Sequence, residues 1–293
     1  MALDEKRVLK PFKKLRKLLA TLDRQPTPEQ VHDLRTSSRR IEATLEAVPP
    51  AFGRNEQRLL RQTAKVRRQA GKVRDMDVLT GYAKALDSYG EQDCIVQLVE
   101  HLGAKRHQYA AKLHRLVKQR RVSLRQTLKK SDKTLRKALT RARDGKSQDL
   151  SREAAATVLQ LSAELREPSR LNKANLHPYR LKVKQLRYVL QNTSSDADQA
   201  LVKALGEVKD AIGEWHDWEE LIAIAEKSLD KRHAGCKLVR ALRAISHRKF
   251  GHALSSAERM RKEYFPQVSA TDKRTPSKSL PKPILAATGR IAA

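Results

Sequence analysis

The sequence predicts an all-α protein built from two related halves. Apolar residues recur at helical spacing, as at Ile41, Leu45 and Val48, so that they line one face of a helix. Strict alternation of apolar and polar residues, which is typical of a half-buried strand, is rare. Only 11 glycines and 11 prolines interrupt the 293 residues, which disfavours a sheet protein rich in tight turns.

The interruptions of the helical spacing set the expected ends of each helix. The second helix is the best marked, because Thr27-Pro28-Glu29-Gln30 has the form of a capping box with proline at the first helical position, and Pro49-Pro50 ends it. The helices are expected at residues 5–22, 28–48, 54–88, 91–144, 150–166, 176–192, 196–230 and 233–264. They form a single domain at 1–265. Residues 266–293 have few apolar anchors and are predicted to be a disordered basic tail.

An internal repeat divides this domain into two halves, at about 1–146 and 147–265. Three matches occur in the same order in both halves, at offsets of 145, 142 and 140 residues. The matched segments are Val31-His32-Asp33-Leu34-Arg35 with Leu176-His177-Pro178-Tyr179-Arg180, Gly71-Lys72-Val73-Arg74-Asp75 with Gly213-Glu214-Trp215-His216-Asp217, and Leu98-Val99 before His107 with Leu238-Val239 before His247. Each half is long enough for a helical bundle.

The charge of the chain calls for a polyanionic partner. Lys and Arg number 62 against 33 Asp and Glu, which leaves a net charge of +29. Self-repulsion on this scale destabilises a compact state unless anions offset it. Nucleic acid, an anionic membrane surface and a phosphate polymer are all candidates, although aromatic residues, at 4%, are too sparse to favour a stacking platform for bases.

Other classes of protein are disfavoured by what the sequence lacks. No apolar run approaches the length of a membrane span, and the N-terminus does not resemble a signal peptide. Cys94 and Cys236 are far apart and predict neither a disulfide framework nor a zinc site. We therefore expect a cytoplasmic protein without a cofactor or a bound metal. The sequence leaves the oligomeric state open.

A stripe of cations is expected on the third helix. On a wheel of about 100° per residue, Arg58, Arg61, Lys65, Arg68 and Lys72 fall within about 80° of one another. Like charges one turn apart cost a helix roughly 0.2–0.5 kcal/mol per pair, and a solvated face normally mixes signs. The stripe therefore indicates a groove for a phosphate-rich chain. The alternative is a chance run in a very basic protein.

A histidine opens a shorter basic stripe in each half. Arg35 and Arg39 fall within about 60° of His32 on the wheel. The second half repeats this arrangement with His177, Arg180, Lys184 and Arg187. His107 and Lys112 have a spacing compatible with a wall that faces the first stripe, and His247 corresponds to His107. In contrast, Lys65 and Arg68 correspond to Glu207 and Asp210, so the first half is expected to dominate binding.

Four motifs together resemble the CHAD family, the conserved histidine α-helical domains. They are His32-x-x-Arg35-x-x-x-Arg39-Arg40, Gly71-x-x-Arg74-Asp75-x-Asp77, Leu176-His177-x-x-Arg180-x-x-x-Lys184-x-x-Arg187 and Gly213-x-x-His216-Asp217. The resemblance covers nearly all of residues 5–265. It implies two four-helix bundles with long antiparallel helices, related by pseudo-twofold symmetry around a basic central groove. It also implies binding of inorganic polyphosphate and, for some members, location on storage granules.

The expected function is binding of polyphosphate without catalysis. The resemblance implies ligand contacts from His32, Arg35, Arg39, Arg40, His177, Arg180, Lys184 and Arg187. Further candidates from the stripes and motifs are Arg61, Lys65, Arg68, Lys72, Arg74, His107, Lys112, Lys209, His216 and His247. Asp75, Asp77 and Asp217 either orient these cations or form ordinary salt bridges.

Two other functions remain open from the sequence. A histone-like nucleic-acid binder is compatible with the charge, and non-specific DNA binding at low salt is expected of any such protein. A metal-dependent phosphohydrolase is suggested by the dipeptides His32-Asp33 and His216-Asp217, although adjacent helical side chains point about 100° apart. No glycine-rich phosphate loop or Glu-x-Glu-x-Lys motif is present.

Overall fold

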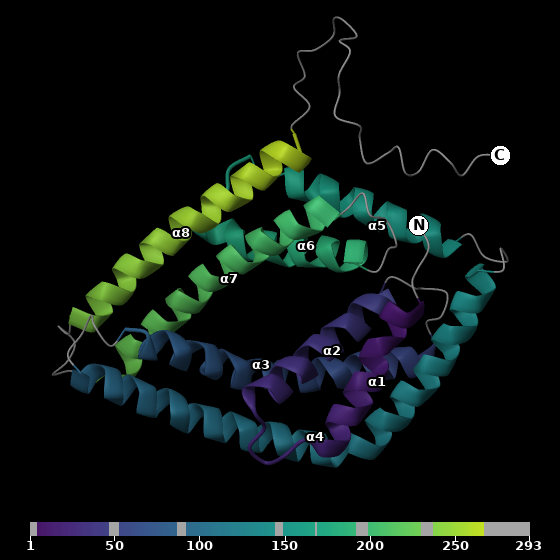
Figure 1. The fold of residues 1–293 in the computed structure, drawn as a ribbon, viewed down its shortest axis with the longest axis horizontal. Helices are drawn as coiled ribbons and strands as arrows, with labels where there is room; N and C mark the ends of the chain where they lie inside the picture. Colours follow the sequence, from purple (N-terminus) through teal and green to yellow (C-terminus); the bar gives the residue numbers. More distant parts are fainter. Residues whose placement is uncertain are drawn as a thin grey trace, which may run out of the picture.

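The structure is a computed structural model that describes residues 5–46, 53–86, 92–143, 149–167, 169–191, 199–229 and 237–266. Within these ranges the chain forms eight α-helices and no strand, so the all-α prediction is confirmed (Figure 1). The helices are α1 (Glu5–Thr21), α2 (Pro28–Glu46), α3 (Arg54–Lys84), α4 (Gln92–Arg143), α5 (Asp149–Arg166), α6 (Lys173–Gln191), α7 (Gln199–Ser228) and α8 (Lys237–Tyr264).

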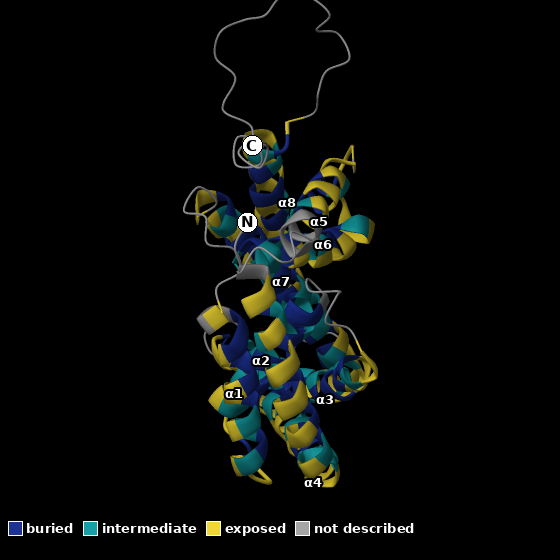
Figure 2. Cartoon of the chain, turned by 90° about the vertical axis from the view of Figure 1, so that its right-hand side faces the viewer, coloured by how far each residue is buried: buried dark blue, intermediate teal, exposed yellow. Residues whose placement is uncertain are grey.

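The helices pack as the two related halves that the repeat predicts. In the first half α1 lies against α2 and α4, and α3 lies against α2 and α4. In the second half α5 packs on α6, α6 on α7 and α7 on α8. The halves meet where α2 contacts α6 and where α7 contacts α3 and α4. Buried residues face inward along each helix and exposed residues face outward (Figure 2).

Each half has its own apolar core, and a third core joins them. The first core draws on α1 to α4 and the second on α5 to α8. The third contains eight buried residues from the tip of the α3–α4 hairpin and eight from the tip of the α7–α8 hairpin. Tyr82 of α3 stacks on Trp218 of α7 within it, with ring centroids 4.7 Å apart and planes 6° from parallel. The sequence did not predict this shared core, which we call the tip core.

The helix starts follow the capping chemistry, with one correction. Thr27 accepts a bond from the Gln30 backbone N–H at 3.2 Å, and the Gln30 side chain accepts one from the Thr27 N–H at 3.0 Å, so the predicted capping box is confirmed. Helix α6 begins at Lys173, three residues before the expected start at residue 176. Asn172 and Asn175 cap each other's backbone N–H groups there, at 2.8 and 3.2 Å.

Some predictions lie outside the described residues. These are the tail beyond Pro266, the division between the halves near residue 146, and Cys236. None of the described helices has an apolar stretch long enough to cross a membrane.

Candidate functional site

The cation stripe of α3 lies on a solvent-facing surface. Arg58, Arg61, Lys65, Arg68 and Lys72 are all exposed, and we call them the α3 stripe. At its start the Arg58 guanidinium donates to Ser123 Oγ of α4 at 2.9 Å. At its end the Lys72 ammonium lies 5.8 Å from the centre of the Tyr109 ring of α4. The stripe thus runs beside α4 and presents five positive charges to solvent.

A second group of cations lies where α2 meets α6. Arg35 and Arg39 come from α2, and Arg180 and Lys184 come from α6. We call these four the inter-half cluster. Burial is the main cause that lowers the pKa of Arg35 and of Arg180, although arginine stays charged near neutral pH. Positions that correspond in the repeat are thus brought together across the contact between the halves.

Lys184 is the most constrained member of the inter-half cluster. Its residue surface is only 8% exposed. Burial, and after it the positive charges of neighbouring side chains, lower the pKa of Lys184 to about 6. These charges act in the order Arg39, Arg180, Arg35 and Lys209. At neutral pH the unliganded protein therefore holds this amine largely uncharged.

Two carboxylates that correspond in the repeat, Asp75 and Asp217, lie beside the cluster. Burial raises the pKa of Asp75, and Arg35 and Arg39 oppose that shift. Burial also raises the pKa of Asp217, to about 6, against the opposing charge of Arg180. Asp75 and Asp217 therefore offset part of the positive charge of the cluster, but the pKa of Lys184 remains lowered.

A cavity of about 540 Å³ opens onto two members of the cluster, Arg39 and Lys184. It lies between α2, α3, α5 and α6, and its lining includes Arg39, Arg67 and Lys184. Arg67 was not predicted as a site residue, because it lies off the α3 stripe on the helical wheel. Its Nε forms an ion pair with Glu42 at 2.7 Å.

The predicted histidines have different surroundings. His177 and His216 lie together, with ring centroids 4.9 Å apart. Burial lowers the pKa of His216, and His177 and Arg180 lower it further. His32 is exposed and contacts Thr36 Oγ1 at 3.3 Å. The two outer candidates are also exposed: the His107 Nδ1 lies 2.9 Å from Gln25 Nε2, and His247 lies on α8.

The remaining candidates are spread over several helices. Arg40 and Lys112 are exposed, and Lys209 pairs with Asp210 at 2.5 Å. Arg187 donates from Nε to the Val202 carbonyl of α7 at 3.3 Å, so its guanidinium lies against that helix.

Asp77 forms a salt bridge, but not the helix-surface salt bridge that the sequence led us to expect. It pairs with Arg106 of α4 at 2.6 Å, but the Asp77 side chain is only 7% exposed and does not lie on the helix surface.

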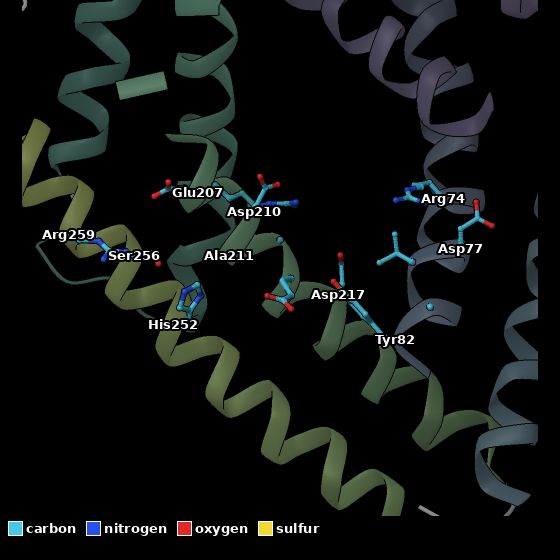
Figure 3. Close-up of a pocket in the computed structure, with 15 residues that line it drawn as sticks. Arg74, Asp77, Tyr82, Glu207, Asp210, Ala211, Asp217, His252, Ser256 and Arg259 are labelled. Atoms are coloured by element: carbon cyan, nitrogen blue, oxygen red, sulfur yellow. The ribbon is translucent and has the colours of Figure 1, made fainter. Parts of the chain in front are cut away.

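The second half carries charge of the opposite sign where the first half carries the α3 stripe. Glu207, Asp210 and Glu214 of α7 correspond to Lys65, Arg68 and Lys72 in the repeat. They line a cavity of about 880 Å³ between α3, α6, α7 and α8, to which Arg180 of α6 also contributes. Figure 3 shows Glu207 and Asp210 on one side of this cavity and Arg74 of α3 on the other. The two halves therefore share a fold but not a surface charge.

The geometry defines an all-α protein of two related helical halves, with half-buried cations concentrated at their junction. The profile described as CHAD domain matches residues 8–226. The chain belongs to the CHAD family.

Two solved structures are similar to this chain. One is the crystal structure of the CHAD domain from the plant Ricinus communis, with a TM-score of 0.62 and 17% identity, over 89% of this chain and 93% of that one. The other is PptA from Streptomyces chartreusis, with a TM-score of 0.64 and 17% identity, over 88% of this chain and 97% of that one. At this identity the likeness shows the fold. No curated protein matches the chain.

Proposed function

We propose that the protein binds inorganic polyphosphate, without catalysis, along a basic surface formed by the inter-half cluster and the α3 stripe. The observation that carries the proposal is Lys184, buried among cations with its pKa lowered to about 6. A buried amine in this setting is costly for the free protein. An anionic ligand reverses that cost, because each cation then gains an opposite charge.

The two groups of cations adjoin along α3. Asp75, whose pKa responds to Arg35 and Arg39, follows Lys72 by three residues on the same helix. From Arg58 to Lys72 the stripe extends about 21 Å at 1.5 Å per residue. A flexible polymer with a charge on every unit fits this layout, since it can follow the stripe and reach the cluster.

The half-buried position of the cluster favours a thin polyanion over duplex DNA. Arg35, Arg180 and Lys184 lie between helices, whereas a duplex presents its phosphates on a wide cylinder. The planar guanidinium pairs well with phosphate oxygens, and the three arginines of the cluster, two from α2 and one from α6, can do so in succession. Exposed cations elsewhere remain available for weak, salt-sensitive DNA binding.

Binding without turnover is supported by the surroundings of the two His-Asp dipeptides. His32 contacts Thr36, whereas its neighbour Asp33 pairs with Lys14 at 2.6 Å. His216 lies beside His177, and the positive charge of Arg180 acts on Asp217 and opposes the rise in its pKa. In the described part of the chain no three His, Cys, Asp or Glu side chains are grouped so as to hold a metal ion.

A binding assay with matched charge reversals tests the proposal. We would titrate long-chain polyphosphate at physiological salt with EDTA present, and compete it with duplex DNA at equal phosphate concentration. The test variant carries Lys65→Glu, Arg68→Glu and Lys72→Glu. The control carries Lys237→Glu, Arg240→Glu and Arg248→Glu, which are exposed cations of α8 and remove the same charge.

The expected result is preferential binding of polyphosphate, weakened at least about tenfold in the test variant and little in the control. Phosphate release should stay at the level of a protein-free sample. Equal losses in both variants would show a diffuse polycation, and a preference for DNA would favour the nucleic-acid function. Loss of binding in EDTA, or phosphate release, would contradict binding without metal or catalysis.

Location follows from the same proposal. A cytoplasmic protein that binds polyphosphate should gather on granules that contain it. A fluorescent fusion, compared in cells with and without polyphosphate, checks this.

A further inference from the structure

We propose that Gly213 of α7 is a positioning residue that holds the Arg180 guanidinium in the inter-half cluster. The role in binding rests on the proposed function, whereas the geometry does not. Gly213 is buried in the middle of a 30-residue helix, where glycine is less favourable than alanine. A packing reason for glycine is therefore expected at this position.

The reason is the space that Arg180 occupies. A Cβ atom at position 213 would overlap Nη2 of Arg180 and lie 3.0 Å from its Cζ and 3.2 Å from its Nε. The Arg180 Nε donates to the Lys209 carbonyl at 3.1 Å. Within the helix the same Lys209 carbonyl faces the Gly213 N–H. Its second lone pair can accept a hydrogen bond from Arg180 only if no side chain at position 213 covers it.

The same arrangement occurs two turns earlier on α7. Arg187 follows Arg180 by seven residues, and Gly206 precedes Gly213 by seven. A Cβ at Gly206 would lie 3.3 Å from the Arg187 Nε, which donates to the Val202 carbonyl. In both cases the accepting carbonyl lies four residues before the glycine. Two antiparallel helices thus repeat one arginine–glycine contact in register.

The first half lacks this contact. Gly71 corresponds to Gly213 and Arg35 to Arg180, yet a Cβ at Gly71 would have nothing within 4 Å. At the other position Ala64 corresponds to Gly206. The glycine requirement is therefore specific to the arginines of α6, and Gly71 provides a matched control on the equivalent helix.

Replacing Gly213 should move the guanidinium rather than unfold the protein. The overlapping atoms are the far end of a flexible side chain, which can swing away at little cost. Once displaced, Arg180 loses its bond to Lys209 and its fixed place beside Lys184 and Asp217, whose pKa values it influences. The ligand must then fix the Arg180 side chain in place when it binds, which costs binding free energy.

The first measurement needs no ligand. The Nε–H resonance of Arg180 is identified by its loss in Arg180→Lys and compared by NMR in the wild type, Gly213→Ala and Gly71→Ala. We expect slow solvent exchange and an unchanged position in the wild type and Gly71→Ala, and fast exchange in Gly213→Ala. An unchanged, protected resonance in a folded Gly213→Ala variant would overturn the positioning role.

The second measurement is affinity for long-chain polyphosphate. Gly213→Ala should weaken binding about tenfold, Gly71→Ala should not, and Gly213→Ala should add nothing in an Arg180→Ala background. A penalty that persists without Arg180 would show a general effect of the methyl group and contradict the inference. Absence of binding by the wild type would instead refute the proposed function and leave the NMR result to decide the positioning role.

Discussion

Replacing Lys184 with methionine should stabilise the free protein and weaken ligand binding at the same time. The pKa of Lys184 is lowered to about 6 from 10.5, mainly by burial. At about 1.4 kcal/mol per pKa unit, the deprotonation imposed at pH 7 costs folding about 5 kcal/mol. Lys184→Met removes this cost, and after imperfect repacking we expect a gain of at least about 1 kcal/mol, or about 2–4 °C in Tm.

The sign of the pH dependence follows from the same pKa. Between about pH 6 and 10.5 the unfolded chain holds a proton on Lys184 that the folded chain does not, so wild-type stability rises with pH across this window. A bound polyanion raises the pKa again, so binding takes up a proton. Affinity should fall about tenfold per pH unit above pH 7, until pH reaches the pKa of the bound state.

Calorimetry in two buffers of different ionisation enthalpy measures the proton uptake. At pH 8 we expect uptake of about one proton per bound site in the wild type and none from this position in Lys184→Met. Urea denaturation of the free proteins measures the stability change. A variant that is less stable, binds as tightly as the wild type and keeps the same proton uptake would refute the reasoning.

Three further predictions follow from other contacts. Asp217→Asn should be more stable than the wild type at pH 7.5, because the buried carboxylate, with its pKa raised to about 6, costs stability when it is charged. Urea denaturation should show this difference in stability disappearing by pH 4, and a difference that does not change with pH would contradict the prediction. Trp218→Ala should lower the free energy of unfolding by about 3–5 kcal/mol, since the ring is buried and stacked on Tyr82; a loss below about 1 kcal/mol would show that the tip core contributes little. Thr27→Ala should cost about 1 kcal/mol in the same assay through loss of the α2 cap, whereas Thr27→Ser should cost less.

The helices could be predicted because their signals are local. The spacing of Ile41 and Leu45 and the cap at Thr27 depend on residues within a few turns of one another. The start of α6 was missed because a reciprocal pair of asparagines, Asn172 and Asn175, replaces the more familiar Ser or Thr with Glu. Capping by short polar side chains is common, but its exact partners depend on rotamers that a sequence does not display.

The candidate site was predictable only where one helix carries it. The exposure of the α3 stripe follows from the 100° step between residues. In contrast, the contact of Arg187 with the Val202 carbonyl and the burial of Lys184 depend on how α6 lies against α7 and α2. These contacts depend on how the helices pack. The repeat indicated that related helices pack together, but not how they are aligned along one another.

The tip core has a mechanical consequence for a duplicated, strongly cationic chain. The inter-half cluster brings like charges from α2 and α6 together, and this repulsion pushes the two halves apart. The apolar contacts of the tip core, with eight buried residues from each half, oppose this repulsion and hold the halves together. A polyanion bound in the cluster would reduce the repulsion, so ligand should raise the force needed to pull the halves apart.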